Sequence, residues 1–168
     1  SLSALACADS SALAHWTPVH VHLGASSVTG RVATLEAKEI APGTAGLVQL
    51  VLERPVGAVY GDHLILRDQS ARRTIGGGRV IDVFPPVRGR ARPDRLEALR
   101  AMENADSAQA LAVLLERAAK GLDLVRFAAC RNLSEAESKR LFDAVPMKRA
   151  ESATQRLGFT SAQWDRLR

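Results

Sequence analysis

The chain has 168 residues, of which 46% are hydrophobic and 24% charged, and its net charge is +5. This composition is that of a folded globular protein, and it excludes a disordered tail, a collagen-like fibre and a disulfide-dense mini-protein. No apolar run approaches the ~18 residues of a membrane span, and no secretion signal opens the chain. Two cysteines far apart, Cys7 and Cys130, fit reduced thiols in a cytoplasmic protein. Because the chain begins at Ser1 rather than Met, we expect a piece of a longer protein.

The positive charge is concentrated in the middle of the chain. Residues 67–100 contain nine arginines and four acidic residues, whereas residues 1–66 contain three basic and five acidic residues. Residues 101–168 are nearly balanced, with eleven basic and nine acidic residues. Such a basic stripe favours a phosphate-bearing partner. The alternative is a solvated surface with a basic linker.

The first half of the chain has the pattern of short β-strands. Apolar and polar residues alternate over residues 18–23, the period of a half-buried strand. Further strands are predicted at 28–35, 47–52, 64–67 and 74–84. In the second of the five strands, Gly30 is expected to mark a bulge or a close approach, and in the last, Ile75, Ile81 and Val83 are expected on one face. Short strands separated by turns indicate a sandwich or a closed barrel over residues 1–86.

The second half has a helical pattern. Pro85 and Pro86 lack a backbone donor and end the β region, and residues 87–92 form an Arg/Gly linker. Helices are predicted to begin near residues 93, 107, 124 and 135; residues 106–109 and 134–137 resemble capping boxes. Residues 147–157 are expected to form a small β wing, and Thr160 to cap a further helix within residues 160–168.

The order helix, helix, helix, wing over residues 93–159 is that of a winged helix-turn-helix. The predicted fold class is therefore multi-domain: an all-β barrel followed by a mainly α winged-helix domain.

The sequence contains no recognisable catalytic or metal motif. Gly76 to Gly78 lack the following Lys and Ser/Thr of a phosphate loop, and a strand packed closely against another backbone explains them better. His20 and His22 have the spacing of two metal ligands, but no third His or Cys is near in sequence, so we expect two outward-facing polar residues and no metal. No serine or cysteine lies in a nucleophile motif. We therefore expect no enzyme active site within this chain.

The predicted phosphate-contacting site is the hairpin between the last two strands of the barrel. Its members share hydrogen-bond donors suited to phosphate or sugar oxygens: Arg67, Ser70, Arg72, Arg73, Thr74 and Arg79. Because a hairpin brings its ends together, these charges are expected to converge on one rim, and arginine can donate two parallel hydrogen bonds to a phosphate. The linker supplies a second basic patch, namely Arg88, Arg90 and Arg92. The alternative is that Asp62 and Asp68 pair with the hairpin arginines and neutralise them.

Low aromatic content narrows the kind of nucleic acid that fits. Only seven of the 168 residues are Phe, Trp or Tyr, so few are available to stack unpaired bases. A protein that contacts the backbone or shape of folded RNA through arginines fits this composition better.

Three segments of the barrel resemble the third domain of translation GTPases related to elongation factor Tu. Residues 16–22 (Trp-Thr-Pro-Val-His-Val-His) and 26–32 (Ser-Ser-Val-Thr-Gly-Arg-Val) resemble the beginning of that β-barrel domain. Residues 64–80 are similar to its Arg…Thr-Ile/Val-Gly-x-Gly-x-Val signature. The Arg-Asp-x-Ser-Ala-Arg form and the Pro-Pro-x-Arg-Gly-Arg-x-Arg-Pro run of residues 85–93 are more like one branch, the selenocysteine-specific elongation factors (SelB). In that branch winged-helix domains follow the barrel, and residues 93–157 are similar to the first.

The resemblance implies a role in selenocysteine delivery. The parent protein would bring selenocysteinyl-tRNA to the ribosome at a recoded stop codon, using GTP and Mg in a domain absent from these residues. This chain would contact the acceptor and T-arm side of the tRNA through phosphates. It would also connect the delivery module to the arm that anchors on an mRNA hairpin. No guanine-reading Asn-Lys-x-Asp motif is present, so we expect the chain itself neither to bind nor to hydrolyse GTP.

Two other functions remain open from the residues. A DNA-binding regulator could use the winged helix, but the expected recognition helix, residues 135–145, carries Lys139 and Arg140 against three acidic residues. A groove-reading helix is normally basic. The other alternative is a structural linker module without any nucleic-acid contact.

Overall fold

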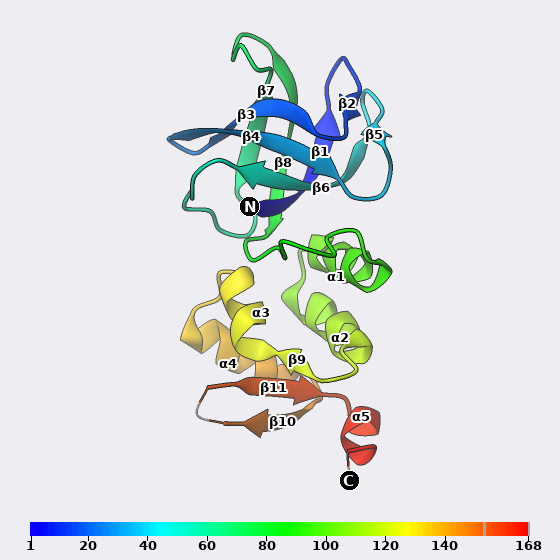
Figure 1. Ribbon diagram of the computed structural model, residues 1–168. Coiled ribbons are helices and arrows are strands. Elements are labelled where there is room, and N and C mark those ends of the chain that lie inside the picture. The colour runs from blue at the N-terminus through cyan, green and yellow to red at the C-terminus, as the bar shows by residue number, and fades with distance from the viewer. Residues whose placement is uncertain (153, 168) are drawn as a thin grey trace. The chain divides into compact units, whose positions relative to one another are not determined.

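The computed structural model describes residues 1–152 and 154–167, which divide into two compact units, Ser1–Leu99 and Arg100–Arg168. The first unit contains a closed barrel in which each strand pairs antiparallel with its neighbours, in the order β1-β6-β4-β3-β7-β8 (Figure 1). Its strands are β1 (Leu2–Ala8), β3 (Thr17–Leu23), β4 (Ser26–Thr34), β6 (Ala45–Leu52), β7 (His63–Arg67) and β8 (Thr74–Asp82). A separate pair, β2 (Leu13–Ala14) and β5 (Glu39–Ile40), lies beside them.

The five predicted strands are present, but the sequence pattern missed the strand that closes the barrel. β1 pairs with β6 on one side and with β8 on the other. Its inward side chains are mainly alanines (Ala4, Ala6 and Ala8), all buried. Alanine is depleted in strands, and β1 has no β-branched residue, so propensity gave no signal there.

The glycines of β8 and β4 lie where two backbones approach closely, as expected. A Cβ at Gly76 would lie 2.6 Å from the carbonyl oxygen of Cys7, and one at Gly30 would lie 2.6 Å from that of Val51. A Cβ at Gly78 would overlap the carbonyl of Leu5. Side chains at these three positions would therefore force neighbouring strands apart.

The expectation that Ile75, Ile81 and Val83 share one face is wrong. Register shifts interrupt β8 near both ends, between the pairs of Leu66 and Arg67 and between those of Ser3 and Ala4. As a result, Ile75 and Val83 pack against the barrel interior, whereas Ile81 belongs to a second cluster. An irregularity in register reverses the alternation that the prediction assumed.

The first turns of helix α1 (Pro93–Glu103) belong to the barrel unit, so the division falls inside this helix rather than at residue 93. Leu96 and Leu99 join the second apolar cluster, whose other members are Leu5, Leu35, Leu47, Tyr60 and Ile81. An ion pair between Arg95 and buried Asp82 fixes the helix, and Arg95 also donates to the Ser3 hydroxyl (3.2 Å).

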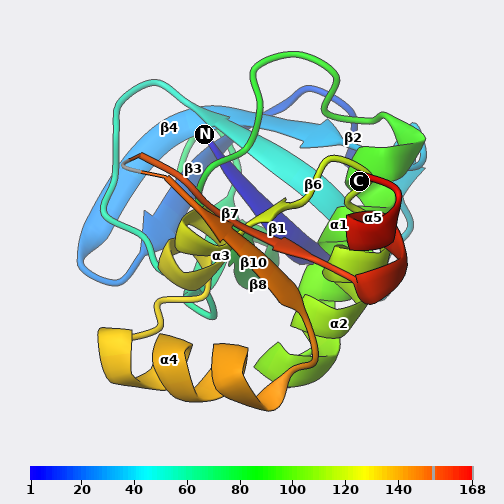
Figure 2. The same ribbon diagram turned by 90° about the horizontal axis from the view of Figure 1, so that it is seen from below.

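The second unit has the order of a winged helix. Its elements are α2 (Ser107–Arg117), β9 (Leu122–Asp123), α3 (Leu124–Cys130), α4 (Glu135–Ala144), β10 (Lys148–Glu151), β11 (Arg156–Phe159) and α5 (Ser161–Asp165). β10 and β11 form the expected wing and make a three-stranded sheet with β9; the two wing strands run side by side in Figure 2. Part of the expected wing, Ala153, lies outside the described residues.

The caps of these helices follow the sequence closely. Ser134 and Thr160 form capping boxes with Glu137 and Gln163. Asp106 caps α2 alone, because the Gln109 side chain accepts from Asn104 instead of returning to the cap. The box expected over residues 106–109 is therefore half formed.

We predict that Arg95→Met lowers the free energy of unfolding of the barrel unit by about 3 kcal/mol, the lower end of the range for breaking a buried pair, since Arg95 is one-fifth exposed. The substitution leaves the Asp82 carboxylate buried without its guanidinium. Denaturant unfolding followed by Trp16 emission, with Trp164 replaced by Phe in every variant, measures the loss. The control is Arg92→Met, which removes an exposed pair with Asp94 and should cost less than ~1 kcal/mol. Equal costs in both variants would contradict the prediction.

Candidate nucleic-acid interface

The connection between β7 and β8 is a turn organised by one carboxylate. Asp68 accepts hydrogen bonds from the backbone amides of Arg72 (2.9 Å) and Arg73 (3.2 Å), and from the hydroxyl of Ser70 (3.0 Å). Backbone bonds between Asp68 and Arg73 and from Ala71 to Asp68 complete the turn, with Ala71 in the left-handed region (φ 56°). Asp68 therefore fixes the backbone from which Arg72 and Arg73 project.

These bonds hold the pKa of the Asp68 carboxyl below its ordinary value of 3.8. The largest cause is the hydrogen bond from the Arg73 amide, with further contributions from the Ser70 hydroxyl and the Arg72 amide. Each favours the ionised carboxylate. The carboxylate is thus ionised at neutral pH and bonded to the turn, which leaves the guanidinium groups of Arg72 and Arg73 without an ion pair among the described residues.

The structure gathers most, but not all, of the predicted phosphate site. Ser70, Arg72, Arg73 and Thr74 are exposed in or next to the turn. Arg73 donates to the Ser10 hydroxyl (2.5 Å).

Two other arginines of the predicted site, Arg67 and Arg79, are not exposed in the turn. Arg67 is half-buried and donates to the carbonyl of Ala71 (3.3 Å), so it supports the turn from behind. Arg79 does not converge on this rim, because it pairs with His63, at the opposite end of β7 from Arg67. The prediction for Arg79 is wrong because β7 and β8 are several residues long, and only the residues next to the turn come together there.

Neither Asp62 nor Asp68 forms an ion pair with the exposed arginines of the turn in the described part of the chain, although attraction to the Arg73 guanidinium also lowers the pKa of Asp68. Asp68 is engaged with backbone amides, and Asp62 accepts from the backbone amide of Val59 (2.9 Å). Both carboxylates organise turns.

The three linker arginines differ in their contacts. Arg92 pairs with Asp94 (3.3 Å), and Arg88 is exposed. Arg90 lies near the ring of Trp16, with its guanidinium carbon 5.9 Å from the ring centroid. The linker patch therefore stays a prediction, in which Arg90 is the member that contacts an aromatic ring of the barrel unit.

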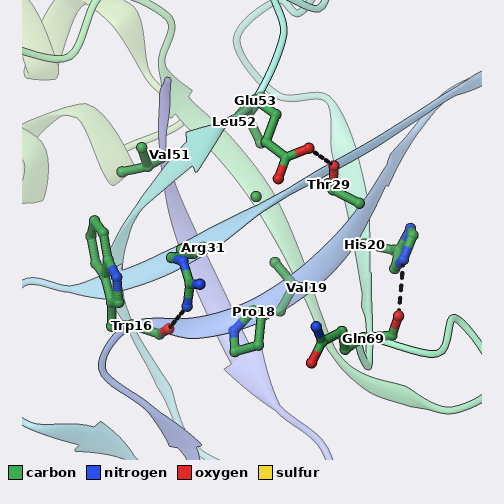
Figure 3. Close-up of a pocket in the computed structure, with 11 residues that line it drawn as sticks. Trp16, Pro18, Val19, His20, Thr29, Arg31, Val51, Leu52, Glu53 and Gln69 are labelled. Atoms are coloured by element: carbon green, nitrogen blue, oxygen red, sulfur yellow. Dashed lines mark hydrogen bonds between the residues drawn. The ribbon is translucent and has the colours of Figure 1, made fainter.

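A groove of about 390 Å³ on the barrel surface adjoins the turn. In Figure 3, His20 and Gln69 lie on one side of it and Trp16 and Arg31 on the other. His20 Nε2 is 3.1 Å from the carbonyl oxygen of Gln69, which joins the turn to β3. The sequence pattern marked His20 as outward-facing but gave no sign of a groove, because the groove depends on the pairing of β3 with β4 and β7.

Metal-binding geometry is not found in the described parts of the chain, where no three His, Cys, Asp or Glu side chains gather. The ring of His20 is hydrogen-bonded to the carbonyl oxygen of Gln69, and the Nε2 atom of His22 is buried without a hydrogen-bond partner. None of the helices described here has the length and apolar character needed to cross a membrane.

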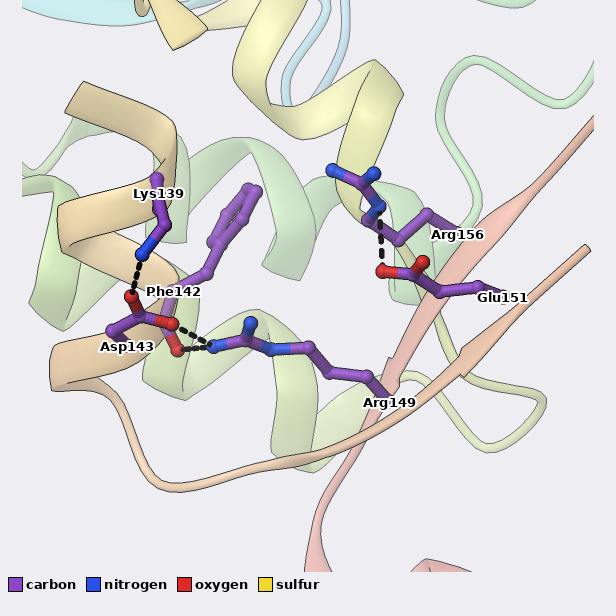
Figure 4. A network of polar contacts seen from close by, with 6 residues as sticks. All are labelled: Lys139, Phe142, Asp143, Arg149, Glu151 and Arg156. Carbon is purple, nitrogen blue, oxygen red and sulfur yellow. Dashed lines mark hydrogen bonds and ion pairs between the residues drawn. The ribbon is translucent and has the colours of Figure 1, made fainter. Parts of the chain in front are cut away.

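On the face of the winged helix that would meet DNA, carboxylates offset part of the positive charge. Lys139 and Arg149 both pair with Asp143 (3.0 Å each), and Arg156 of the wing pairs with Glu151 (2.9 Å), as Figure 4 shows. Lys139 first, and then Arg149, hold the pKa of Asp143 below its ordinary value. The basic groups of α4 and the wing are therefore largely matched by acidic neighbours.

The described residues form a closed six-stranded antiparallel barrel followed by a unit with the element order of a winged helix, which defines the class as a β-barrel protein with a helical extension. The family model for the beta-barrel domain of the selenocysteine-specific elongation factor matches residues 2–87. The chain belongs to this family, the selenocysteine-specific elongation factors (SelB).

Curated relatives carry the same name. The chain is 42% identical to the selenocysteine-specific elongation factor of Escherichia coli over 73% of its length, and 34% identical to that of Haemophilus influenzae over 59%. It is 32% identical to that of Desulfomicrobium baculatum over 77%. These matches span 18%, 16% and 20% of the three relatives, so the chain corresponds to about a fifth of each.

We predict that Asp68→Ala loosens the turn without unfolding the barrel. Hydrogen exchange at the amides of Arg72 and Arg73, measured by NMR, should accelerate, because both lose their acceptor. In the unsubstituted chain the same bonds should persist at neutral pH and be lost only as the pH falls through the depressed pKa of Asp68, below 3.8. Asp62→Ala is the control and should leave these two amides protected. Unchanged exchange in Asp68→Ala would refute this account of the turn.

Proposed function

We propose that this chain is the tRNA-contacting and connecting portion of a selenocysteine-specific elongation factor. The observation that carries the proposal is the turn of residues 68–73, where Arg72 and Arg73 are exposed on a backbone fixed by Asp68. An exposed guanidinium without a carboxylate partner retains its paired donors for a phosphate. The partner would be selenocysteinyl-tRNA, contacted on its acceptor and T-arm side through the backbone.

The chain would act as a binding and connecting module rather than an enzyme. GTP and Mg would be held by a domain elsewhere in the parent protein, and contacts with the ribosome and an mRNA hairpin would involve the parent as a whole. A cytoplasmic location would follow from that role. The winged helix would have mainly a connecting part, since its ion pairs leave little net charge for releasing counterions from nucleic acid.

The tRNA proposal predicts a change in salt dependence. Arg72→Ala combined with Arg73→Ala should weaken binding to a selenocysteine tRNA transcript and flatten the slope of log K against log salt by about 1.5, as each phosphate contact contributes roughly 0.7–0.9. The melting temperature should remain nearly unchanged, because both side chains are exposed. An unchanged slope in the folded double variant would rule out phosphate contacts at these positions.

The winged helix supplies a matched comparison with the same loss of charge. Lys139→Gln combined with Arg140→Gln should leave both tRNA binding and its salt slope unaltered, and the unsubstituted chain should not shift duplex DNA at physiological salt in a gel assay. A slope reduced by about 1.5 in this variant would mean that α4 contacts nucleic acid. A duplex-specific shift would instead favour the DNA-binding alternative.

A further inference from the structure

Trp16 occupies an unusual backbone position on the barrel surface. Its φ is 68°, in the left-handed region that aromatic residues rarely adopt, and its side chain is 43% exposed. The backbone is held there by hydrogen bonds from the Trp16 amide to Val32 (2.7 Å) and from Arg31 Nη1 to the Trp16 carbonyl (3.2 Å). Such a conformation persists only where surrounding contacts determine it. The indole ring is therefore presented at a fixed place.

Two guanidinium groups lie against this ring. The guanidinium carbons of Arg31, from β4, and Arg90, from the linker, are each 5.9 Å from the ring centroid. Both distances fall within the range of a cation–π interaction. One residue of the barrel thus orders two arginines that are far apart in sequence.

Neither arginine has an acidic partner in the described parts of the chain. Arg31 donates to the Trp16 carbonyl, and Arg90 makes one long bond (3.5 Å) to the carbonyl of Val87. A guanidinium has five N–H donors, so most donors of both groups remain available. Stacking on an aromatic ring leaves the edge of the guanidinium free to bind an oxyanion.

The position of this Trp16 cluster (Trp16, Arg31 and Arg90) indicates what it would bind. Trp16 and Arg31 line the groove whose other side is formed by His20 and by Gln69 of the phosphate-contacting turn (Figure 3). Glu53 also lines the groove, where its carboxylate accepts a hydrogen bond from the Thr29 hydroxyl. A ligand that extends from the turn across the groove and carries repeated negative charges would pass this one carboxylate and meet both basic groups. The backbone of a folded RNA has this chemistry.

We propose that the Trp16 cluster is a second RNA-backbone site, in which Trp16 orders Arg31 and Arg90 for phosphate contacts on the far side of the groove from the turn. The proposal rests on the tRNA role given above. In it, Trp16 positions arginines and does not stack a base, and the linker binds RNA only through the arginine that is fixed to the barrel.

Substitutions in the 168-residue chain test the site. Arg31→Gln combined with Arg90→Gln should reduce the slope of log K against log salt for the tRNA transcript by about 1.5. The corresponding double Lys variant should retain the slope but bind more weakly, because lysine keeps the charge and loses the fork geometry. Arg88→Gln is the matched control in the same linker and should leave the slope unchanged. An unaltered slope in the double Gln variant, or an equal loss per charge in Arg88→Gln, would overturn the proposal.

A spectroscopic measurement does not depend on how these variants fold. The difference between the emission of the unsubstituted chain and that of Trp16→Phe isolates Trp16 from Trp164, the other tryptophan. Saturating tRNA should change this difference spectrum; no change would overturn the proposal.

The variants of Arg72 and Arg73 distinguish refutation of the Trp16 cluster from refutation of tRNA binding by the chain. If Arg72→Ala with Arg73→Ala flattens the slope while the Arg31 and Arg90 variants do not, only the second site is refuted. If the unsubstituted chain does not bind tRNA, both proposals fall together.

Discussion

The close approach of β8 to β1 is the constraint on which the barrel depends. These two strands are the first and last of the closed sheet, and their pairing removes both sheet edges. Gly76 and Gly78 make the approach possible, since a Cβ at either would meet a carbonyl of β1. On the β1 side, small alanine side chains fill the interior opposite these glycines. Both strands have small residues because their backbones approach closely there.

Strand β8 positions a functional or structural feature at each of its two ends. At its beginning, β8 continues from the turn that Asp68 organises, so the register of the β7–β8 pair decides where Arg72 and Arg73 stand. At its end, Asp82 holds Arg95 of α1, so the linker between them is attached at both ends to the barrel unit. Closure of the barrel thus positions both the candidate RNA-contacting turn and the first turns of the helix.

The sequence was informative wherever a local chemical rule decides the structure. The turn after Arg67 and the caps at Ser134 and Thr160 depend on residues near one another in sequence. The close backbone approaches join distant residues, but the glycines themselves mark them in the sequence. It failed where tertiary pairing overrides propensity. β1 is held by its two partner strands rather than by β-forming side chains, and the register shifts in β8 separate Ile81 from Ile75.

Long-range contacts explain the rest of what the sequence could not predict. Arg131 is buried, and its guanidinium donates to the carbonyls of Met102 at the end of α1 and of Asn104 and Ala105 in the connection to α2. A buried arginine satisfied by backbone carbonyls has no periodic signature. The meeting of Arg31, Arg90 and Trp16 is of the same kind, since it joins a strand, a linker and a turn.

The way carboxylates are used distinguishes the two units. In the barrel unit, Asp68 bonds to backbone amides, which rigidifies the turn and leaves neighbouring guanidinium groups for an external phosphate. In the winged-helix unit, Asp143 and Glu151 bond directly to Lys139, Arg149 and Arg156, so two carboxylates offset part of the positive charge of three basic side chains.

Exposed pairs of this kind add little stability, so their main physical effect is on the local field that a nucleic acid would meet. The net charge of a helix is therefore less informative than the partner of each carboxylate. An acidic residue that binds the backbone preserves a basic surface, whereas one that binds a basic side chain removes it. On this argument the β7–β8 turn is the surface that we propose for phosphate, although the barrel strands contain fewer basic residues than the winged helix.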